Sequence, residues 1–328
     1  MKIAYALTTA LAFATAGGSL APMPCVAQQA TTASQYRYAT IDYPGAAGSV
    51  CVGINNRNEL ACTAFGFSED LPFRYDSRSG LFSLIPVNPP SGWNADAFGI
   101  NDSDTVVGFV YPPDDSVENG FVITEYADYR EFAVPWAAYT EARGINNSGM
   151  ITGTVFFNGP GSAGFVFDPK AGTYSEILPS PYTEAVGVTS KGDIVGTVYL
   201  DAGAIGPAAP AGQYGYLRTS GGSVTYFRVN GQNTYARGIS DEGTVVGYFG
   251  DLPFPQVAGF VAKVGALREG KSPAAGFVAL SVPTKNKVQI PGAFGTLPQG
   301  VSDSGNISGT FVDASGVPHG FIARPRHD

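Results

Sequence analysis

A ten-residue motif recurs six times along the chain, and it constrains the fold more than any other feature. Each copy begins with Gly and then Ile or Val, continues through residues rich in Asn, Asp and Ser, and in five copies ends in Gly. The copies start at Gly53, Gly99, Gly144, Gly187, Gly238 and Gly300, at intervals of 46, 45, 43, 51 and 62 residues. A period in the forties indicates an array in which every repeat is one unit of supersecondary structure.

Each copy of the motif predicts a tight β-hairpin. An apolar strand end leads into Asn, Asp and Ser, whose side chains bond to their own backbone, and a Gly that tolerates positive φ usually follows. A second apolar run such as Val106-Val107 then begins. We expect a type I turn with a glycine bulge.

A second landmark follows each hairpin, and it supplies two more strands. Gly-Phe, or a close relative of it, opens a β-rich segment at Gly120, Gly164, Gly215 and Gly276, while Pro72-Phe73 takes this place in the first copy. Each segment contains a strand, a turn and a second strand. Four antiparallel strands per repeat, arranged around an axis, make a propeller blade.

The two ends of the repeat array predict that the ring closes. The last copy has its motif at Gly300 and its Gly-Phe strand at Gly320-Phe321, but it lacks a fourth strand. Residues 38–46 near the start match residues 287–293 in the preceding repeat. An N-terminal strand that completes the C-terminal blade would remove the exposed sheet edges of an open array.

The sequence therefore predicts an all-β, six-bladed β-propeller with four-stranded antiparallel blades. The long fifth interval contains an additional Gly259-Phe260, so residues 248–275 hold either an inserted hairpin or a degenerate seventh blade. A β-solenoid is the rival fold, but its repeats are usually shorter and need no strand from the other terminus.

Composition agrees with this fold and excludes several others. Gly and Pro together make 67 of the 328 residues, which excludes helical bundles and coiled coils. Hydrophobic residues make 44% of the chain and charged residues only 14%, which argues against disorder. A net charge of −8 argues against nucleic acid as a partner.

The first 27 residues have the pattern of a secretory signal. Met1-Lys2 is followed by an apolar run to about Ala16, and small residues precede a cleavage point before Gln28. The run is shorter than the roughly 20 residues that span a bilayer, and no later segment is long and apolar enough. We expect residues 28–328 to form one exported propeller domain, secreted or periplasmic and monomeric.

The cysteines predict one disulfide. Cys51 and Cys62 flank the first repeat turn, and a turn centred between Asn56 and Arg57 would place them opposite each other. Directly opposed residues on antiparallel strands have Cβ atoms close enough for a disulfide. Such a bond persists in an oxidising compartment, and two free buried thiols are the alternative.

These motifs resemble those of the HAF-repeat family of extracellular bacterial proteins. The nearest matches are His319-Gly320-Phe321 and the segment 40–46, and the resemblance covers essentially the whole exported chain. It implies export and a propeller-like repeat fold, but no common enzymatic activity. The chain departs from the family pattern because only one Gly-Phe copy is preceded by His.

The best-placed candidate site comes from the strand that precedes each repeat Gly. Three residues before that Gly stand Asp96, Glu141, Glu184 and Tyr235 in consecutive repeats, and one residue before it stand Arg143 and Arg237. If these strands are innermost, the side chains line the central channel. The carboxylates of Asp96, Glu141 and Glu184 could there bind a cation such as calcium or hydrogen-bond sugar hydroxyls. The alternative is that Glu141 and Arg143 pair across blades or face solvent.

Other chemistry is poorly supplied. Asp102, Asp104, Asp241 and Asp303 lie in the repeat turns, where we expect them to cap backbone groups, because no copy continues into a calcium-loop spacing. The chain has only two His residues, which disfavours histidine catalysis. No cofactor or metal site is predicted.

Two functions fit this pattern. The first is a non-catalytic binding module for a glycan or a protein. The second is a propeller glycoside hydrolase or lyase that uses Asp96, Glu141 and Glu184 as acid, base or nucleophile. The separation and pairing of these carboxylates discriminate between the two.

Overall fold

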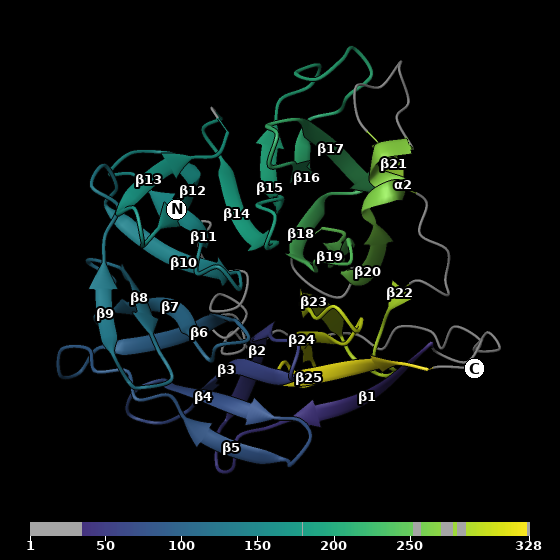
Figure 1. Ribbon diagram of the computed structural model, residues 1–328. Coiled ribbons are helices and arrows are strands. Elements are labelled where there is room, and N and C mark those ends of the chain that lie inside the picture. Colours follow the sequence, from purple (N-terminus) through teal and green to yellow (C-terminus); the bar gives the residue numbers. More distant parts are fainter. Residues whose placement is uncertain (1–34, 179, 252–256, 270–277, 281–286, 327–328) are drawn as a thin grey trace, which may run out of the picture.

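The computed structural model describes residues 35–178, 180–251, 257–269, 278–280 and 287–326. These residues form six sheets arranged around an axis, as Figure 1 shows. The predicted six-bladed propeller is therefore confirmed. The predicted signal peptide, residues 1–27, lies outside the described residues.

Each blade is an antiparallel sheet of four strands, counted outward from the axis. The first two blades contain β2 (Gly48–Ile54), β3 (Glu59–Phe65), β4 (Leu71–Asp76) and β5 (Leu81–Leu84), then β6 (Asn94–Ile100), β7 (Val106–Tyr111), β8 (Asn119–Ile123) and β9 (Tyr129–Phe132). The third and fourth contain β10 (Tyr139–Ile145), β11 (Ile151–Phe156), β12 (Ser162–Asp168) and β13 (Thr173–Glu176), then β14 (Thr183–Val188), β15 (Ile194–Leu200), β16 (Gly212–Arg218) and β17 (Val224–Val229). The fifth and sixth contain β18 (Thr234–Ile239), β19 (Thr244–Phe249), β20 (Ala258–Lys263) and β22 (Lys287–Val288), then β23 (Gly295–Val301), β24 (Ile307–Val312), β25 (Pro318–Pro325) and β1 (Tyr36–Ile41).

The sixth blade is closed by the N-terminal strand, as the sequence predicts. β1 pairs antiparallel with β25, from Tyr36 opposite Pro325 to Ile41 opposite Gly320. Figure 1 shows the two strands side by side, purple against yellow. The ladder covers the outer edge of β25, and Ile41 is buried.

The core lies between the blades, and the Gly-Phe landmark supplies its anchors. The aromatic residue of this landmark stands on the third strand of each blade and is 0–1% exposed. These residues are Phe73, Phe121, Phe165, Tyr216, Phe260 and Phe321. Each blade thus buries one large aromatic ring at this position of its third strand.

The fifth blade differs from the prediction. Its third strand is β20, which contains Gly259-Phe260, and not the segment that begins at Gly276. Among the described residues of 248–275 there is neither an inserted hairpin nor a seventh blade, because β19 and β20 pair directly as strands of the fifth blade. The insertion follows β20 and contains α2 (Val264–Glu269) and β21 (Val278–Leu280). β21 pairs parallel with β17, which covers the outer edge of the neighbouring blade.

The repeat turn has the predicted geometry. The sixth residue of each motif has positive φ, and it is Gly in four copies, Asn58 in the first and Asp104 in the second. Asn and Asp are the residues that tolerate this conformation best after Gly. In the first copy the Asn58 N–H donates to the Asn55 carbonyl, and the Asn55 N–H donates to the Glu59 carbonyl.

Each inner strand also carries a β-bulge that the sequence analysis did not foresee. In every blade the register shifts at the residue that precedes the repeat Gly. The bulged residues are Val52, Phe98, Arg143, Val186, Arg237 and Gln299. A bulge re-aims a side chain without ending the strand pairing.

The predicted disulfide between Cys51 and Cys62 is present, and the two residues are directly opposed. The turn itself is centred half a residue later than predicted, since Ile54 faces Leu60. The bulge at Val52 restores the expected register before Cys51. The predicted pairing of Cys51 with Cys62 was thus correct because the bulge shifts the register back by as much as the later turn centre had shifted it.

Replacing both Cys51 and Cys62 with Ala should lower the free energy of unfolding by about 3 kcal/mol, because the bond closes a short loop in the unfolded chain. Both side chains are fully buried, so small replacements are the appropriate change. Urea titration with and without dithiothreitol measures the effect. The reductant should destabilise the wild type and leave the double variant unaffected; equal midpoints for both proteins would contradict a stabilising bond.

Candidate functional site

The propeller has two faces, which the direction of the inner strands defines. All six repeat turns line one pocket on the axis, so all six inner strands end at this end, the turn face. The inner strands begin at the opposite end, the loop face. The loop face also carries the connections between blades and between the second and third strands, because neighbouring strands are antiparallel.

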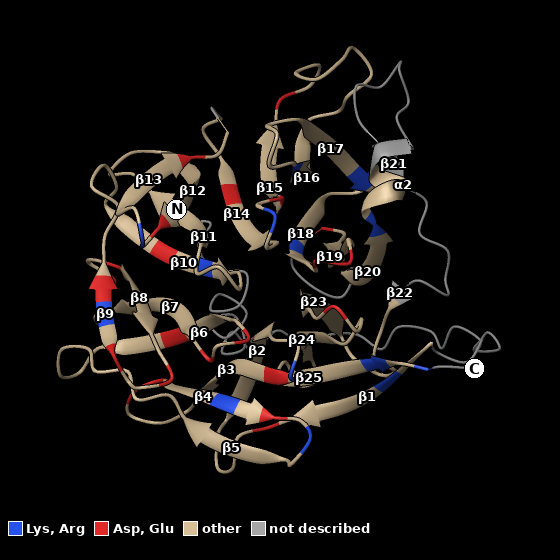
Figure 2. Cartoon of the chain, viewed as in Figure 1, with Lys and Arg blue, Asp and Glu red and all other residues tan. Residues whose placement is uncertain are grey.

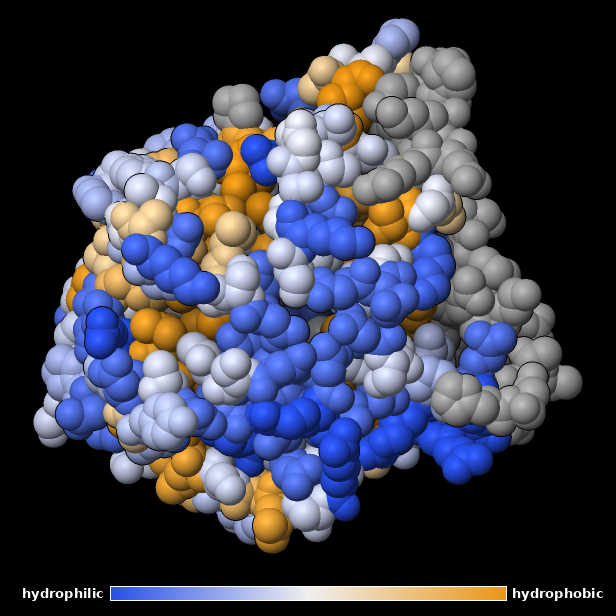
Figure 3. All heavy atoms as spheres, in the orientation of Figure 1, coloured by the Kyte–Doolittle hydropathy of each residue, from blue (hydrophilic) through white to orange (hydrophobic). Residues whose placement is uncertain are grey.

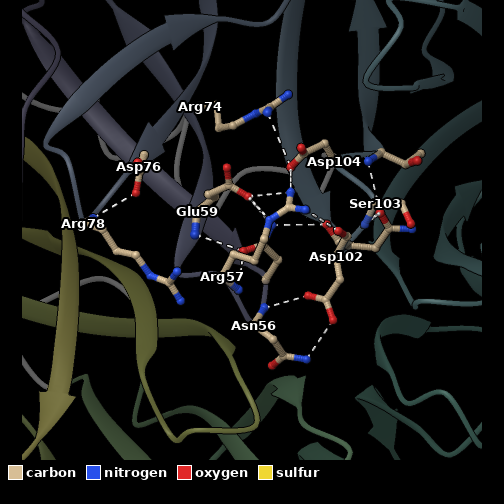
Figure 4. A network of polar contacts seen from close by, with 12 residues as sticks. Asn56, Arg57, Glu59, Arg74, Asp76, Arg78, Asp102, Ser103 and Asp104 are labelled. Atoms are coloured by element: carbon tan, nitrogen blue, oxygen red, sulfur yellow. Dashed lines mark hydrogen bonds and ion pairs between the residues drawn. The ribbon is translucent and has the colours of Figure 1, made fainter.

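The turn face is held by a belt of hydrogen bonds around the axis. In five of the six motifs the fourth residue donates its backbone N–H to the side chain of the fourth residue in the next blade. Asn56 donates to Asp102 Oδ1 at 2.8 Å, and Asp102 donates to Asn147 Oδ1 at 2.9 Å. Ser190 donates to Asp241, Asp241 to Asp303, and Asp303 to Asn56. Figure 4 shows Asn56 against Asp102.

The belt explains the Asn, Asp and Ser residues of the motif as structural. The third residue of the second motif has a structural role within its own turn. There, Asn101 Oδ1 accepts the N–H groups of Ser103 and Thr105. Beside the belt, Arg57 bonds Glu59 and Asp104, and Arg74 lies 3.4 Å from Asp104, as Figure 4 shows. The turn carboxylates therefore already have partners within the fold.

One link of the belt is missing among the described residues, that from the Asn147 N–H to position 190. The side chain of Ser190 is shorter than the Asn or Asp found at the other positions. Ser190→Asn should complete the belt and raise the free energy of unfolding by about 1 kcal/mol. Thermal unfolding measures this gain. Ser103→Asn, an exposed change in a neighbouring turn, is the control and should have no effect; equal melting temperatures for the two variants would contradict the belt.

The candidate residues lie on neighbouring inner strands, in the channel between the two faces. Figure 2 shows acidic segments on β6, β10 and β14 around the centre, with basic segments on β10 and β18. In the view of Figure 3, hydrophilic residues gather over the middle of the ring. The structure thus brings the acidic, basic and tyrosine candidates together along one side of the channel.

Glu141 forms an ion pair with Arg143 of the same strand, so the predicted pairing across blades is wrong for these two. The bulge at position 143 allows residues two apart to meet. Glu141 is 1% exposed, and burial raises its pKa although the Arg143 guanidinium opposes the rise. Glu118, at the start of β8, shares a hydrogen bond with it. The Arg143 guanidinium also lies 4.4 Å from the ring centre of Phe98 in the preceding blade.

Glu184 pairs across blades. Arg237 Nη1 donates to Glu184 Oε2 at 2.6 Å, and Arg237 Nη2 donates to the Tyr248 hydroxyl at 2.9 Å. Burial alone would raise the pKa of Glu184, but Arg237 and Arg143 hold it below its ordinary value. Tyr235 stacks on Tyr248 with ring centres 4.9 Å apart, and burial raises the pKa of Tyr235 to about 12. This part of the channel is therefore a charged pair beside two tyrosine rings.

Asp96 has no arginine bonded to it. Burial, together with the nearby carboxylate of Asp70, raises the pKa of Asp96 to about 8, against the opposing effect of Arg143. Its Oδ1 atom is buried and has no hydrogen-bond partner among the described residues. The Tyr111 hydroxyl donates to Asp70 Oδ2 at 2.8 Å beside it. Burial therefore favours the neutral, protonated form of Asp96 over the carboxylate.

The sequence analysis missed four members of this cluster. Asp70, Tyr111, Glu118 and Tyr248 stand on second and third strands or next to them, outside the repeat positions that were compared. The position opposite each candidate on the second strand is a signal that could have found Tyr248, which faces Tyr235. The polar candidates occupy only four of the six blades. In the first and sixth blades the equivalent positions are Val50 and Leu297, which are buried.

The channel does not gather a metal site. Within the described part of the chain, no three His, Cys, Asp or Glu side chains lie close enough together to hold a metal ion. Nor does any described helix have the length and apolar composition needed to cross a membrane. The chemistry on offer is therefore hydrogen bonding, charge and aromatic contact.

Comparison with known proteins shows the fold alone. No family model matches the sequence, and no curated protein matches it. A protein named as a candidate gluconolactonase is 13% identical, with 89% of this chain and 94% of that chain covered and a TM-score of 0.50. The β-propeller domain of the Trilobed protease from Pyrococcus furiosus is 13% identical over 86% of this chain and 84% of that chain, with a TM-score of 0.47. An oligogalacturonate lyase in complex with manganese is 10% identical over 89% and 97%, also with a TM-score of 0.47. The chain is thus similar to β-propellers of mixed function.

Proposed function

We propose that the protein is a non-catalytic binding module that takes a glycan at its loop face. The observation that carries this proposal is a set of exposed aromatic side chains on the loop face. These side chains are Phe67, Trp136, Tyr182, Tyr199 and Phe294, each 37–47% exposed. All of them stand just before an inner strand or at the far end of a second strand, which places them on the loop face.

Aromatic faces beside charged and hydroxyl groups suit a sugar ring. The ring's CH face packs on an aromatic plane, while carboxylates and guanidiniums bond its hydroxyls. Tyr182 and Tyr199 form one such platform, with ring centres 6.3 Å apart, and Tyr182 lies two residues before Glu184. Binding pockets commonly combine aromatic lining with a few polar groups in this way.

The pairing of the carboxylates favours binding over hydrolysis. A glycosidase needs one carboxylic acid and one carboxylate flanking the scissile bond. Glu141 and Glu184 are each bonded to an arginine, which supports their use as fixed hydrogen-bond acceptors. We therefore favour the binding module over the hydrolase or lyase.

Screening the purified protein on a glycan array, followed by calorimetry on the bound glycans, tests the proposal. Trp136→Ala and Tyr182→Ala should each lower the affinity by about tenfold or more, because each removes an aromatic contact surface. Tyr126→Ala is the matched control, since Tyr126 is 85% exposed but lies in the β8–β9 turn on the turn face. An equal loss in all three variants, or no glycan bound, would reject the proposed site.

We further propose that this binding occurs outside the cytoplasm, in the periplasm or after secretion. The disulfide supports an oxidising compartment. We also propose that the chain belongs to the HAF-repeat family, since its propeller fold agrees with the fold that the sequence resemblance implies.

A further inference from the structure

The channel mouth holds more acidic than basic groups. Five carboxyl groups act on one another there, and two guanidiniums face them. The carboxyl groups are Asp70, Asp96, Glu118, Glu141 and Glu184, and the guanidiniums are Arg143 and Arg237. Buried carboxylates need a positive partner or a proton. The mouth is therefore short of positive charge.

Among these carboxyl groups, the lack of nearby positive charge is greatest at Asp96. Thr63 of β3, Asp70, Tyr111 of β7, and Glu141 with Arg143 of β10 are the polar groups that surround it. Arg143 is already bonded to Glu141 and so offers Asp96 only a distant charge. Either a proton on Asp96 or a bound cation would balance the charge of the site.

Three buried threonine hydroxyls on second strands, those of Thr154, Thr197 and Thr310, have no hydrogen-bond partner among the described residues. Thr310 lies opposite the apolar Leu297 of the sixth blade. Thr154 and Thr197 are 1% and 3% exposed. They lie directly opposite Glu141 and Glu184 on the adjacent strands, so their side chains are on the same face of the sheet. In the first blade the equivalent Thr63 is satisfied, because its Oγ1 accepts the Ala97 N–H at 3.0 Å.

We propose that the glycan carries a free primary amine, and that its ammonium group binds beside the buried, unpartnered Oδ1 atom of Asp96. This inference rests on the proposed glycan binding and names its substrate class. An ammonium has three N–H donors, which suit several separated acceptors such as Asp96, Glu141 and the Thr154 hydroxyl. A divalent cation is a poorer fit, since the described carboxylates do not gather three ligands at one point.

The step is balanced in charge. When the free amine is already an ammonium group and Asp96 carries a proton, binding leaves Asp96 a carboxylate and one proton passes to the buffer. Neutral and acidic glycans have no charge to offer in return for this proton. Chitosan oligosaccharides, which are glucosamine oligomers, should therefore bind at least tenfold more tightly than their N-acetylated counterparts or oligogalacturonates.

Calorimetry at an acidic pH at which the amino groups of the free oligosaccharide are already ammonium, in two buffers of different ionisation enthalpy, measures both affinity and proton release. Wild type should release close to one proton on binding chitosan oligosaccharides. Asp96→Asn, which keeps the shape of the protonated side chain, should bind them roughly ten- to hundredfold more weakly and release none. Asp128→Asn, an exposed carboxylate on the turn face, is the control and should match the wild type.

Thr154→Val separates ligand binding from folding. Because the hydroxyl has no partner in the free protein, its removal should leave the melting temperature unchanged or raised while it weakens chitosan binding several-fold. Equal affinity for chitosan and its N-acetylated form, without proton release, would overturn the amine inference and leave glycan binding standing. If no glycan of any class binds, the proposed function itself is wrong.

Discussion

A protein that lacks residues 1–41 is expected not to fold into a stable monomer. This truncation removes β1, which makes six cross-strand pairs with β25 and contributes the buried Ile41. The whole outer edge of β25 would then be open for pairing with another chain. The net free energy of unfolding of a domain is only roughly 5–15 kcal/mol. We expect the lost strand pairing, together with association of the exposed edge, to exceed it. Circular dichroism and size-exclusion chromatography measure the outcome.

The matched control is a chain that begins at residue 35, which retains β1. It should unfold at the same urea concentration as the chain of residues 28–328. A synthetic peptide of residues 35–47 should restore the folded monomer of the truncated chain by adding the missing strand. A truncated chain that stays monomeric and melts at the control temperature would show that closure contributes little.

Gly144→Ala is expected to destabilise the protein by roughly 3 kcal/mol or more. A Cβ atom on Gly144 would lie 2.0 Å from the carbonyl oxygen of Val186, the bulged residue of the next blade. This neighbour is backbone and is held in the inner-strand ladder, so it cannot move aside as a side chain would. Denaturant titration measures the loss. The repeat Gly thus exists because neighbouring inner strands approach one another closely around the axis.

Gly159→Ala is the control for this change. Gly159 has no heavy atom within 4 Å of an added Cβ and no positive φ. Its substitution should alter the free energy of unfolding by less than about 0.5 kcal/mol. Similar losses in both variants would show that general helix or strand propensity, and not the contact with Val186, determines the cost.

Repetition is what made the fold predictable. Six copies of one motif fix the number of blades, and the match between residues 38–46 and 287–293 identifies the strand that closes the ring. The pairing of Cys51 with Cys62 follows from the turn because register in a hairpin is local. These conclusions depend on patterns that lie within a few residues or recur at a fixed spacing.

The candidate site was harder to predict from the sequence than the fold. Its repeat positions were found, but their partners were not, because Asp70 and Glu118 stand outside the motif and differ between blades. The six bulged positions before the repeat Gly share no residue type, since Val, Phe, Arg and Gln all occur there. Without the bulge, the contact between Glu141 and Arg143 could not be foreseen. In the fifth blade two Gly-Phe segments competed, and only coordinates distinguish them.

The pairing of β1 with β25 also sets the order in which the protein can form. Within each blade, the first three strands follow one another along the chain and meet by closing short loops. β1 must instead close a loop of nearly the whole chain, at an entropic cost of about 5 kcal/mol relative to adjacent residues. On the ribosome, residues 36–41 are made long before residues 318–325 and must wait for them. We therefore expect ring closure to be a late and slow folding event.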